Sequence, residues 1–122
     1  MDSFDREEVK SFLDLGEQEL YGLLVPERAR QQLNSPGALM ARGKNIFLSR
    51  ASEVRSIVCR QYKQRGTSMK NTIDLTVLVA TALLASPAML GIPVLPMAAL
   101  LVKIGLEEFC RSVTPEANPG HG

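Results

Sequence analysis

The stretch LTVLVATALLASPAMLGIPVLPMAALLV runs from Leu75 to Val102 and contains no charged side chain, although the residues on both sides of it are rich in charges. Its 28 residues have to be buried, either in a lipid bilayer or in most of the core of a small helical domain. These two environments imply different functions. The stretch, called the apolar stretch below, therefore decides which class of protein this is.

Proline and glycine interrupt the apolar stretch near its centre. Proline removes a backbone donor and clashes with the preceding helical turn, so the cluster predicts a bend between two helices, near 70–86 and 94–112. Thr67 or Ser68 is expected to cap the first of them. The result is an apolar helical hairpin, and its expected interaction residues are Leu75, Val79, Leu83, Pro87, Gly91, Pro93, Pro96 and Leu100.

The length of the apolar stretch tests the membrane interpretation. One crossing of a bilayer needs roughly 20 helical residues, so two crossings and a turn need about 40. Only 28 residues are available, and a single long crossing would be kinked by three prolines. Averaged over windows of about 19 residues, the hydropathy nevertheless reaches the level usual for membrane spans. A shallow, re-entrant hairpin agrees best with these observations.

A soluble core is the alternative for the same residues. Apolar runs of about 10–14 residues are typical of buried core helices, and each arm of the hairpin is close to that size. A helix that is hydrophobic on all sides must be covered on all sides. The helices that precede the stretch offer three apolar faces, a supply that is barely sufficient and favours self-association or a protein partner.

Helix signals are clear at the start of the chain. Asp5 followed by Glu8 is the pattern of a capping box, and it predicts a helix that begins near Arg6. Apolar residues at three-to-four spacing continue to Leu24. Gly16 falls inside this pattern as a weak point or a break.

Two further helices are expected before the apolar stretch. Pro26 suits the first turn of a short helix through Leu33. The next helix is the most regular one and ends at Gly66; Gly43 either separates it from an earlier turn or lies within it. Its apolar stripe consists of Phe47, Ala51, Val54, Val58 and Tyr62.

These elements predict an all-α fold, a small helical bundle with amphipathic N-terminal helices and a C-terminal apolar hairpin. Residues 1–66 form the amphipathic region and residues 67–112 the hairpin. Residues 113–122, rich in proline and glycine, are expected to be a disordered tail. At 122 residues the chain has room for one modest core.

Charge is distributed unevenly although the net charge is only +1. Residues 1–25 carry a balance of −5, residues 26–70 a balance of +8, and the remainder −2. We expect the basic surface to be a solvated face that pairs with the acidic first helix, with anionic lipid headgroups as another use. Nucleic-acid binding through residues 42–70 is a weaker alternative, because the cations spread around the helix and aromatic residues are scarce. The basic surface comprises Arg50, Arg55, Arg60, Lys63, Arg65 and Lys70.

One ion pair is predicted at the mouth of the hairpin. Asp74 and Lys103 stand at opposite ends of the apolar stretch, and these ends meet in an antiparallel hairpin. A pair between them would tie the two arms together.

Catalysis finds little support in the sequence. The single histidine, His121, lies two residues from the end in a proline- and glycine-rich segment, where packing does not hold a general base. No phosphate-loop, dinucleotide-binding, zinc-protease or nucleophile-elbow motif occurs. Cys59 and Cys110 are far apart and form no CxxC pair, so they are expected to be free thiols. No metal site, cofactor or small-molecule substrate is indicated.

The sequence therefore suggests a non-enzymatic helical protein whose hairpin inserts in or associates with a membrane as an oligomer, in an anchoring, signalling or permeabilising role. Its expected partners are membrane lipid or other copies of the chain. The alternative is a soluble bundle that binds a protein partner or itself. The acidic first residues lack the order of a secretory signal, so the expected location is the cytoplasmic face of a membrane, or else the cytoplasm.

Overall fold

The fold is helical throughout the part of the chain that the computed structural model describes, residues 4–111. No strand occurs within this range, which confirms the predicted all-α class. The α-helices are α1 (Arg6–Leu13), α2 (Glu17–Leu23), α3 (Glu27–Arg30), α4 (Pro36–Gln64), α5 (Thr72–Leu84), α6 (Val94–Ile104) and α7 (Leu106–Arg111); two 3-10 turns are η1 (Gly66–Ser68) and η2 (Pro87–Met89).

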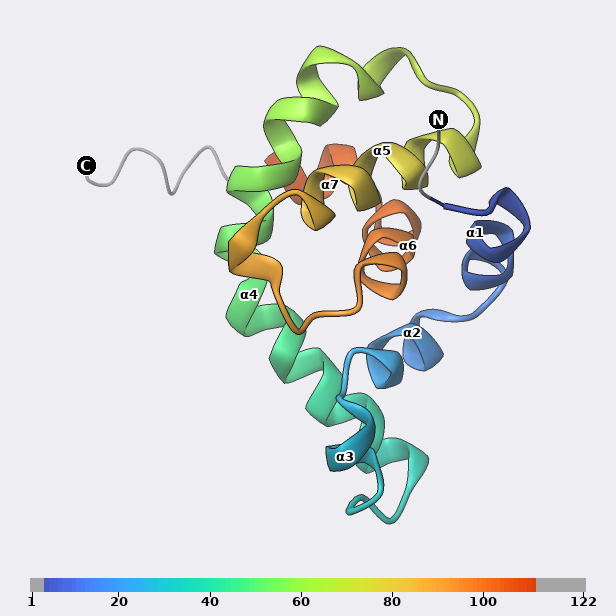
Figure 1. Ribbon diagram of the computed structural model, residues 1–122, viewed down its shortest axis with the longest axis vertical. Coiled ribbons are helices and arrows are strands. Elements are labelled where there is room, and N and C mark those ends of the chain that lie inside the picture. Colours follow the sequence, from blue (N-terminus) through green and yellow to red (C-terminus); the bar gives the residue numbers. More distant parts are fainter. Residues whose placement is uncertain (1–3, 112–122) are drawn as a thin grey trace, which may run out of the picture.

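Helix α6 is the centre of the molecule. Every residue from Leu95 to Leu101 is buried, including those on opposite sides of the helix. The helix contacts α1, α2, α5 and α7, and Figure 1 shows it almost end-on between its neighbours. The chain's own helices thus provide the cover that a helix with apolar residues on all sides requires.

The predicted hairpin is present, with η2 in the bend between α5 and α6. The two arms contact each other. Their axes cross at a large angle, since Figure 1 shows α5 from the side and α6 almost end-on. The second arm is shorter than predicted, since Gly105 adopts a φ of 109° and ends α6 before α7 begins. Within residues 4–111, no helix combines the length and the apolarity that a membrane crossing demands.

The cap of the first arm also differs from the prediction. Asn71, rather than Thr67 or Ser68, is the N-cap of α5, and its side chain accepts hydrogen bonds from the backbone N–H groups of Ile73 and Asp74. Thr67 and Ser68 instead lie in η1, which carries the chain away from the end of α4. Because η1 precedes it, α5 begins a few residues later than predicted.

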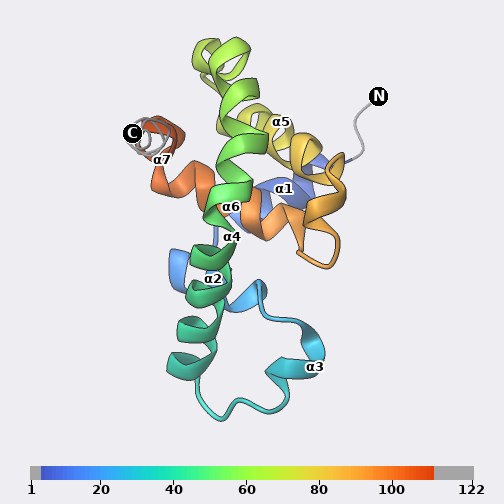
Figure 2. The same ribbon diagram turned by 90° about the vertical axis from the view of Figure 1, so that its left-hand side faces the viewer.

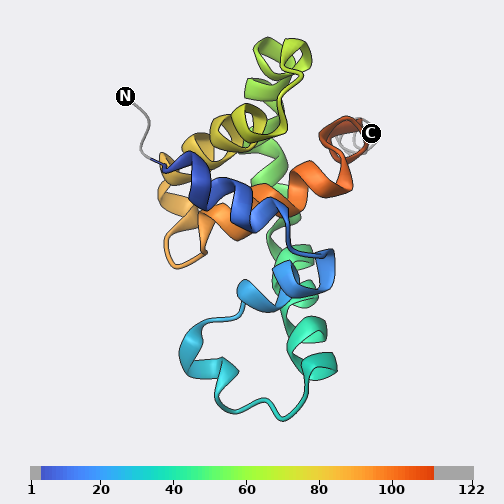
Figure 3. The ribbon, with the colours of Figure 1, turned by 90° about the vertical axis from the view of Figure 1, so that its right-hand side faces the viewer.

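Helix α4 is the long spine of the fold, as Figures 2 and 3 show. Ser35 caps it by accepting a hydrogen bond from the Ala38 amide at 3.1 Å. Gly43 lies inside the helix, which settles the alternative left open by the sequence. The predicted stripe faces the core: Phe47, Ala51, Val54 and Val58 are buried and Tyr62 is partly buried.

The N-terminal pattern divides at Gly16. Asp5 caps α1 through its side chain, which accepts from the Glu7 amide at 2.9 Å, so the predicted start at Arg6 is confirmed. Gly16 is the N-cap of α2, and its amide donates to the Glu19 carboxylate at 2.9 Å. The break allows α1 and α2 to contact α6 separately.

Cys59 and Cys110 form a disulfide, contrary to the expectation of free thiols. Their Cα atoms are 5.6 Å apart although 51 residues separate them in sequence, because α7 returns to the C-terminal half of α4. The guanidinium of Arg55 lies 4.9 Å from the centre of the Phe109 ring, and its Nε donates to the Phe109 carbonyl at 3.3 Å. Helix α7 is therefore fixed to α4 by a covalent bond and by an arginine.

Candidate interaction surface

The hairpin tip, residues 84–92, is the part of the apolar stretch that remains open to solvent. Leu90 is 81% exposed and Leu84 is 57% exposed, and both belong to the most exposed large apolar side chains of residues 4–111. Figures 2 and 3 show this segment extending away from α4. The exposed residues of the tip are Leu84, Ala85, Pro87, Ala88, Leu90 and Gly91.

Backbone amides at the tip are largely bonded within the tip or to the end of α5. The turn and η2 supply hydrogen bonds of 3.0–3.2 Å, and Pro87 has no N–H to satisfy. The bonded amides are those of Ala85, Ser86, Met89, Leu90 and Ile92. A segment of this kind can leave water at lower cost than a loop with open amides.

An apolar groove adjoins the tip where α6 begins. Its walls come from α1, α2 and the start of α6, and Arg30 of α3 lies at its side. The apolar surface of the tip therefore continues along the molecule. Besides Arg30, one other charged residue, Glu8, lines the groove, and its apolar lining consists of Phe4, Phe12, Leu23, Pro93, Val94, Leu95 and Pro96.

The predicted hairpin residues separate into two groups. Val79, Leu83, Pro96 and Leu100 are buried in the core, so they hold the fold together and are not available for contact. Pro87 and Gly91 are exposed at the tip, whereas Leu75 and Pro93 are partly buried.

The two leucines that dominate the tip, Leu84 and Leu90, are not among the interaction residues predicted from the sequence. The available signal was position: Leu84 ends α5, and Leu90 lies between η2 and Gly91, where the chain turns. An apolar residue in a turn has few neighbours of its own chain to cover it.

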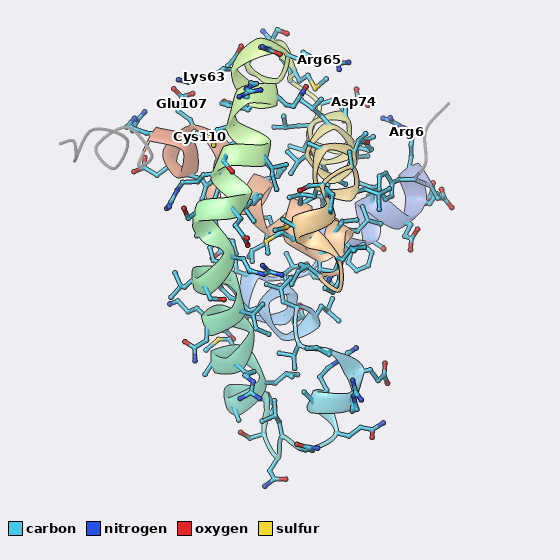
Figure 4. The ribbon with its side chains drawn as sticks, turned by 60° about the vertical axis from the view of Figure 1, so that its left-hand side comes forward. Arg6, Lys63, Arg65, Asp74, Glu107 and Cys110 are labelled. Atoms are coloured by element: carbon cyan, nitrogen blue, oxygen red, sulfur yellow. A yellow bond between two sulfur atoms is a disulfide. The ribbon has the colours of Figure 1, made fainter. Side chains whose placement is uncertain are left out.

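The predicted ion pair between Asp74 and Lys103 is not formed. Asp74 instead accepts from Arg6 at 2.6 Å, and Lys103 Nζ donates to the Leu13 carbonyl at 2.8 Å. Both partners belong to α1, which contacts α5 and α6 and so supplies a closer group to each. Figure 4 shows Arg6 beside Asp74.

The Arg6–Asp74 pair is expected to stabilise the fold only slightly, because the side chains are 50% and 47% exposed. A double-mutant cycle of Arg6→Gln and Asp74→Asn should give a coupling energy of about 0.2–1 kcal/mol in urea unfolding. The same cycle with Lys103→Gln in place of Arg6→Gln should give no coupling. A larger coupling for Lys103 than for Arg6 would contradict the assignment.

The basic surface does not pair with the acidic first helix. Arg50 pairs at 2.6 Å with Glu53 of its own helix, and Arg55 lies against Phe109. Within residues 4–111, no ion pair joins a carboxylate of α1 to a cation of α4. The remaining members are exposed near the end of α4 and in the turn after it: Arg60, Lys63, Arg65 and Lys70.

No group of three or more His, Cys, Asp or Glu side chains in the described part of the chain could hold a metal ion. His121 and the predicted tail, residues 113–122, lie outside the described residues. Comparison of the chain with protein-family models, with curated proteins and with solved structures finds no match.

Proposed function

We propose that this is a non-enzymatic helical protein that associates with a membrane surface through the hairpin tip. The observation that carries the proposal is the exposure of Leu84 and Leu90 in a segment without charge. The other apolar residues of the two arms are buried or partly buried. Contact with lipid is therefore expected to be shallow, with the tip in the headgroup and upper acyl region.

The bonding of the backbone lowers the cost of placing the tip in lipid. Polar backbone groups have no water to bond with in hydrocarbon, so groups satisfied internally enter it at lower cost. Five amides of the tip are satisfied, whereas those of Ala88 and Gly91 form no backbone hydrogen bond within residues 4–111. The prolines at 87 and 93 contribute further apolar surface without adding a donor.

The expected affinity is modest. Burial of one leucine side chain contributes about 1.5–3 kcal/mol, so two leucines provide at most roughly 3–6 kcal/mol. This is comparable to a single acyl anchor, whose membrane binding is reversible. Stable attachment requires a second contact, and we propose that several copies in an oligomer present their tips together.

Vesicle binding tests this proposal. Replacing Leu84 and Leu90 together with aspartate should lower co-sedimentation with phosphatidylcholine vesicles at least about tenfold, because two charges would enter the interface. Binding of the unchanged protein should persist at high salt, since the tip has no charge. The matched control is Leu48→Asp, a 59% exposed leucine on α4, which should leave vesicle binding unchanged.

The same variants address the alternative of a soluble, self-associating bundle, which the burial of Leu95 to Leu101 by the chain's own helices favours. If the unchanged protein ignores vesicles but sediments as an oligomer that Leu84→Asp/Leu90→Asp dissociates, the tip binds other copies and the membrane proposal is wrong. Equal vesicle binding by the unchanged protein and the double variant would also reject it.

A further inference from the structure

We propose that Cys110 is a site of thiol–disulfide exchange for a small thiol that carries carboxylates, of the glutathione type. The proposal is independent of the membrane function. It depends on a groove that reaches one half of the disulfide, and on a lysine that lies beside both cysteines.

The groove lies between the C-terminal part of α4 and α7. Cys110 lines it, whereas Cys59 does not, so an incoming thiol meets the Cys110 side of the bond first. Figure 4 shows Cys110 close to Glu107 and Lys63. The other lining residues are Tyr62, Thr67 and Arg111.

Among the described residues, Lys63 is the cation of the groove that takes part in no ion pair. Arg111 is shared between Glu107 at 3.8 Å and Glu108 at 3.1 Å. Lys63 is exposed and has no ion pair within residues 4–111. The ammonium group of Lys63 is therefore available to attract an anionic thiol to the groove. Arg111 attracts it less, because the two glutamates partly neutralise its charge.

A tyrosine, Tyr62, also lines the groove. Tyr62 donates a hydrogen bond to Glu107 at 3.4 Å. Burial, together with the Glu107 carboxylate, raises the pKa of Tyr62, so its hydroxyl stays protonated at neutral pH. Tyr62 thus adds no negative charge that would repel an anionic thiol.

The exchange proceeds in two balanced steps. The thiolate attacks Sγ of Cys110, a new S–S bond forms there, the Cys59–Cys110 bond breaks, and its electron pair leaves on Cys59 as a thiolate. A second thiolate then attacks the mixed disulfide, forms the oxidised small-molecule disulfide and releases Cys110 as a thiolate. The two thiolates of the protein take protons from water, so the protein gains two electrons and the two small thiols lose them.

Lys63 also favours the departure of Cys59, and not of Cys110, as the thiolate in the first step. It lies one helical turn after Cys59 on α4, so the two residues are neighbours on the surface of this helix. A nearby cation stabilises a thiolate and makes it a better leaving group. In a reducing compartment the bond would open by this route, whereas in an oxidising compartment it would persist.

Trapping experiments on the full chain test the proposal. Oxidised protein is exposed briefly to glutathione, quenched with N-ethylmaleimide, and digested for mass spectrometry. We expect glutathione on Cys110 and the alkyl group on Cys59. The rates of disulfide reduction by glutathione and by 2-mercaptoethanol are also measured, each normalised to that of an unstructured disulfide peptide. We expect the ratio of the glutathione rate to the 2-mercaptoethanol rate to fall about twofold to fivefold in Lys63→Glu.

Two matched variants separate a local charge effect from a general one. Lys63→Gln should give an intermediate ratio, and Lys44→Glu, an exposed lysine elsewhere on α4, should leave it unchanged. Salt at about 1 M should remove the difference between the variants. The proposal is overturned if glutathione appears mainly on Cys59, if Lys63→Glu has the same ratio as the unchanged protein, or if the purified chain cannot be oxidised to a Cys59–Cys110 bond.

Discussion

Gly43→Ala should lower the free energy of unfolding by about 3–5 kcal/mol, despite the better helix propensity of alanine. A Cβ atom at position 43 would lie 1.7 Å from the carbonyl oxygen of Tyr21 and 2.3 Å from its carbonyl carbon. Backbone atoms cannot rotate away as a flexible side chain can, so α2 and α4 would have to separate. Since α2 also contacts α6, the separation would open the core.

Urea unfolding followed by circular dichroism measures this effect. Gly37→Ala is the matched control, because it lies in the same helix and its Cβ would meet nothing closer than Ser35 Oγ at 4.0 Å. This variant should be neutral or stabilised by up to about 1 kcal/mol. If both alanine variants unfold at the same urea concentration, the close crossing at Gly43 is not what holds α2 on α4.

Removal of the disulfide is the second large effect. Closing a loop across a sequence separation of 51 residues restricts the unfolded chain, and the loop-entropy model assigns about 4 kcal/mol to that restriction. Small domains are stable by only about 5–15 kcal/mol. Cys59→Ser/Cys110→Ser should therefore unfold at a much lower denaturant concentration than the oxidised protein.

Reduction of the unchanged protein provides an independent measurement of the same quantity. The reduced protein and the double serine variant should unfold at similar denaturant concentrations, whereas the oxidised protein should unfold at a higher one. The disulfide would be absent or irrelevant to stability if reduction left the midpoint unchanged.

The helices were predictable where local chemistry determines them. Asp5 caps α1 as expected, because a side-chain oxygen satisfies amides only a few residues away. The apolar stripe of α4 and the bend of the hairpin follow equally from spacing and from proline. In each case the information lies within one or two helical turns.

Features that depend on distant partners could not be predicted in this way. Asp74 and Lys103 were predicted to pair because they stand at the ends of the two hairpin arms. Helix α1 contacts both arms, and its Arg6 and the Leu13 carbonyl bond to Asp74 and Lys103 instead. Cys59 and Cys110 meet only because Gly105 ends α6 and lets α7 return to α4. Tertiary packing decides these contacts, and no local pattern records it.

The candidate surface was predicted only in part for the same reason. The apolar stretch was correctly expected to need cover, yet hydropathy does not distinguish Leu83, which is 1% exposed, from Leu84, which is 57% exposed. The direction in which each side chain points depends on how α5 is oriented against its neighbours. The membrane association itself stays a prediction.

The central position of α6 has a consequence for how the chain folds during synthesis. Helices α1, α2 and α5 all bury apolar residues against a segment that begins only at Val94. A growing chain therefore has to carry three unpaired apolar faces until most of its length has been made. We expect no stable native core before that point, so that the order of synthesis leaves the protein dependent on chaperones, or on an apolar surface, until α6 emerges.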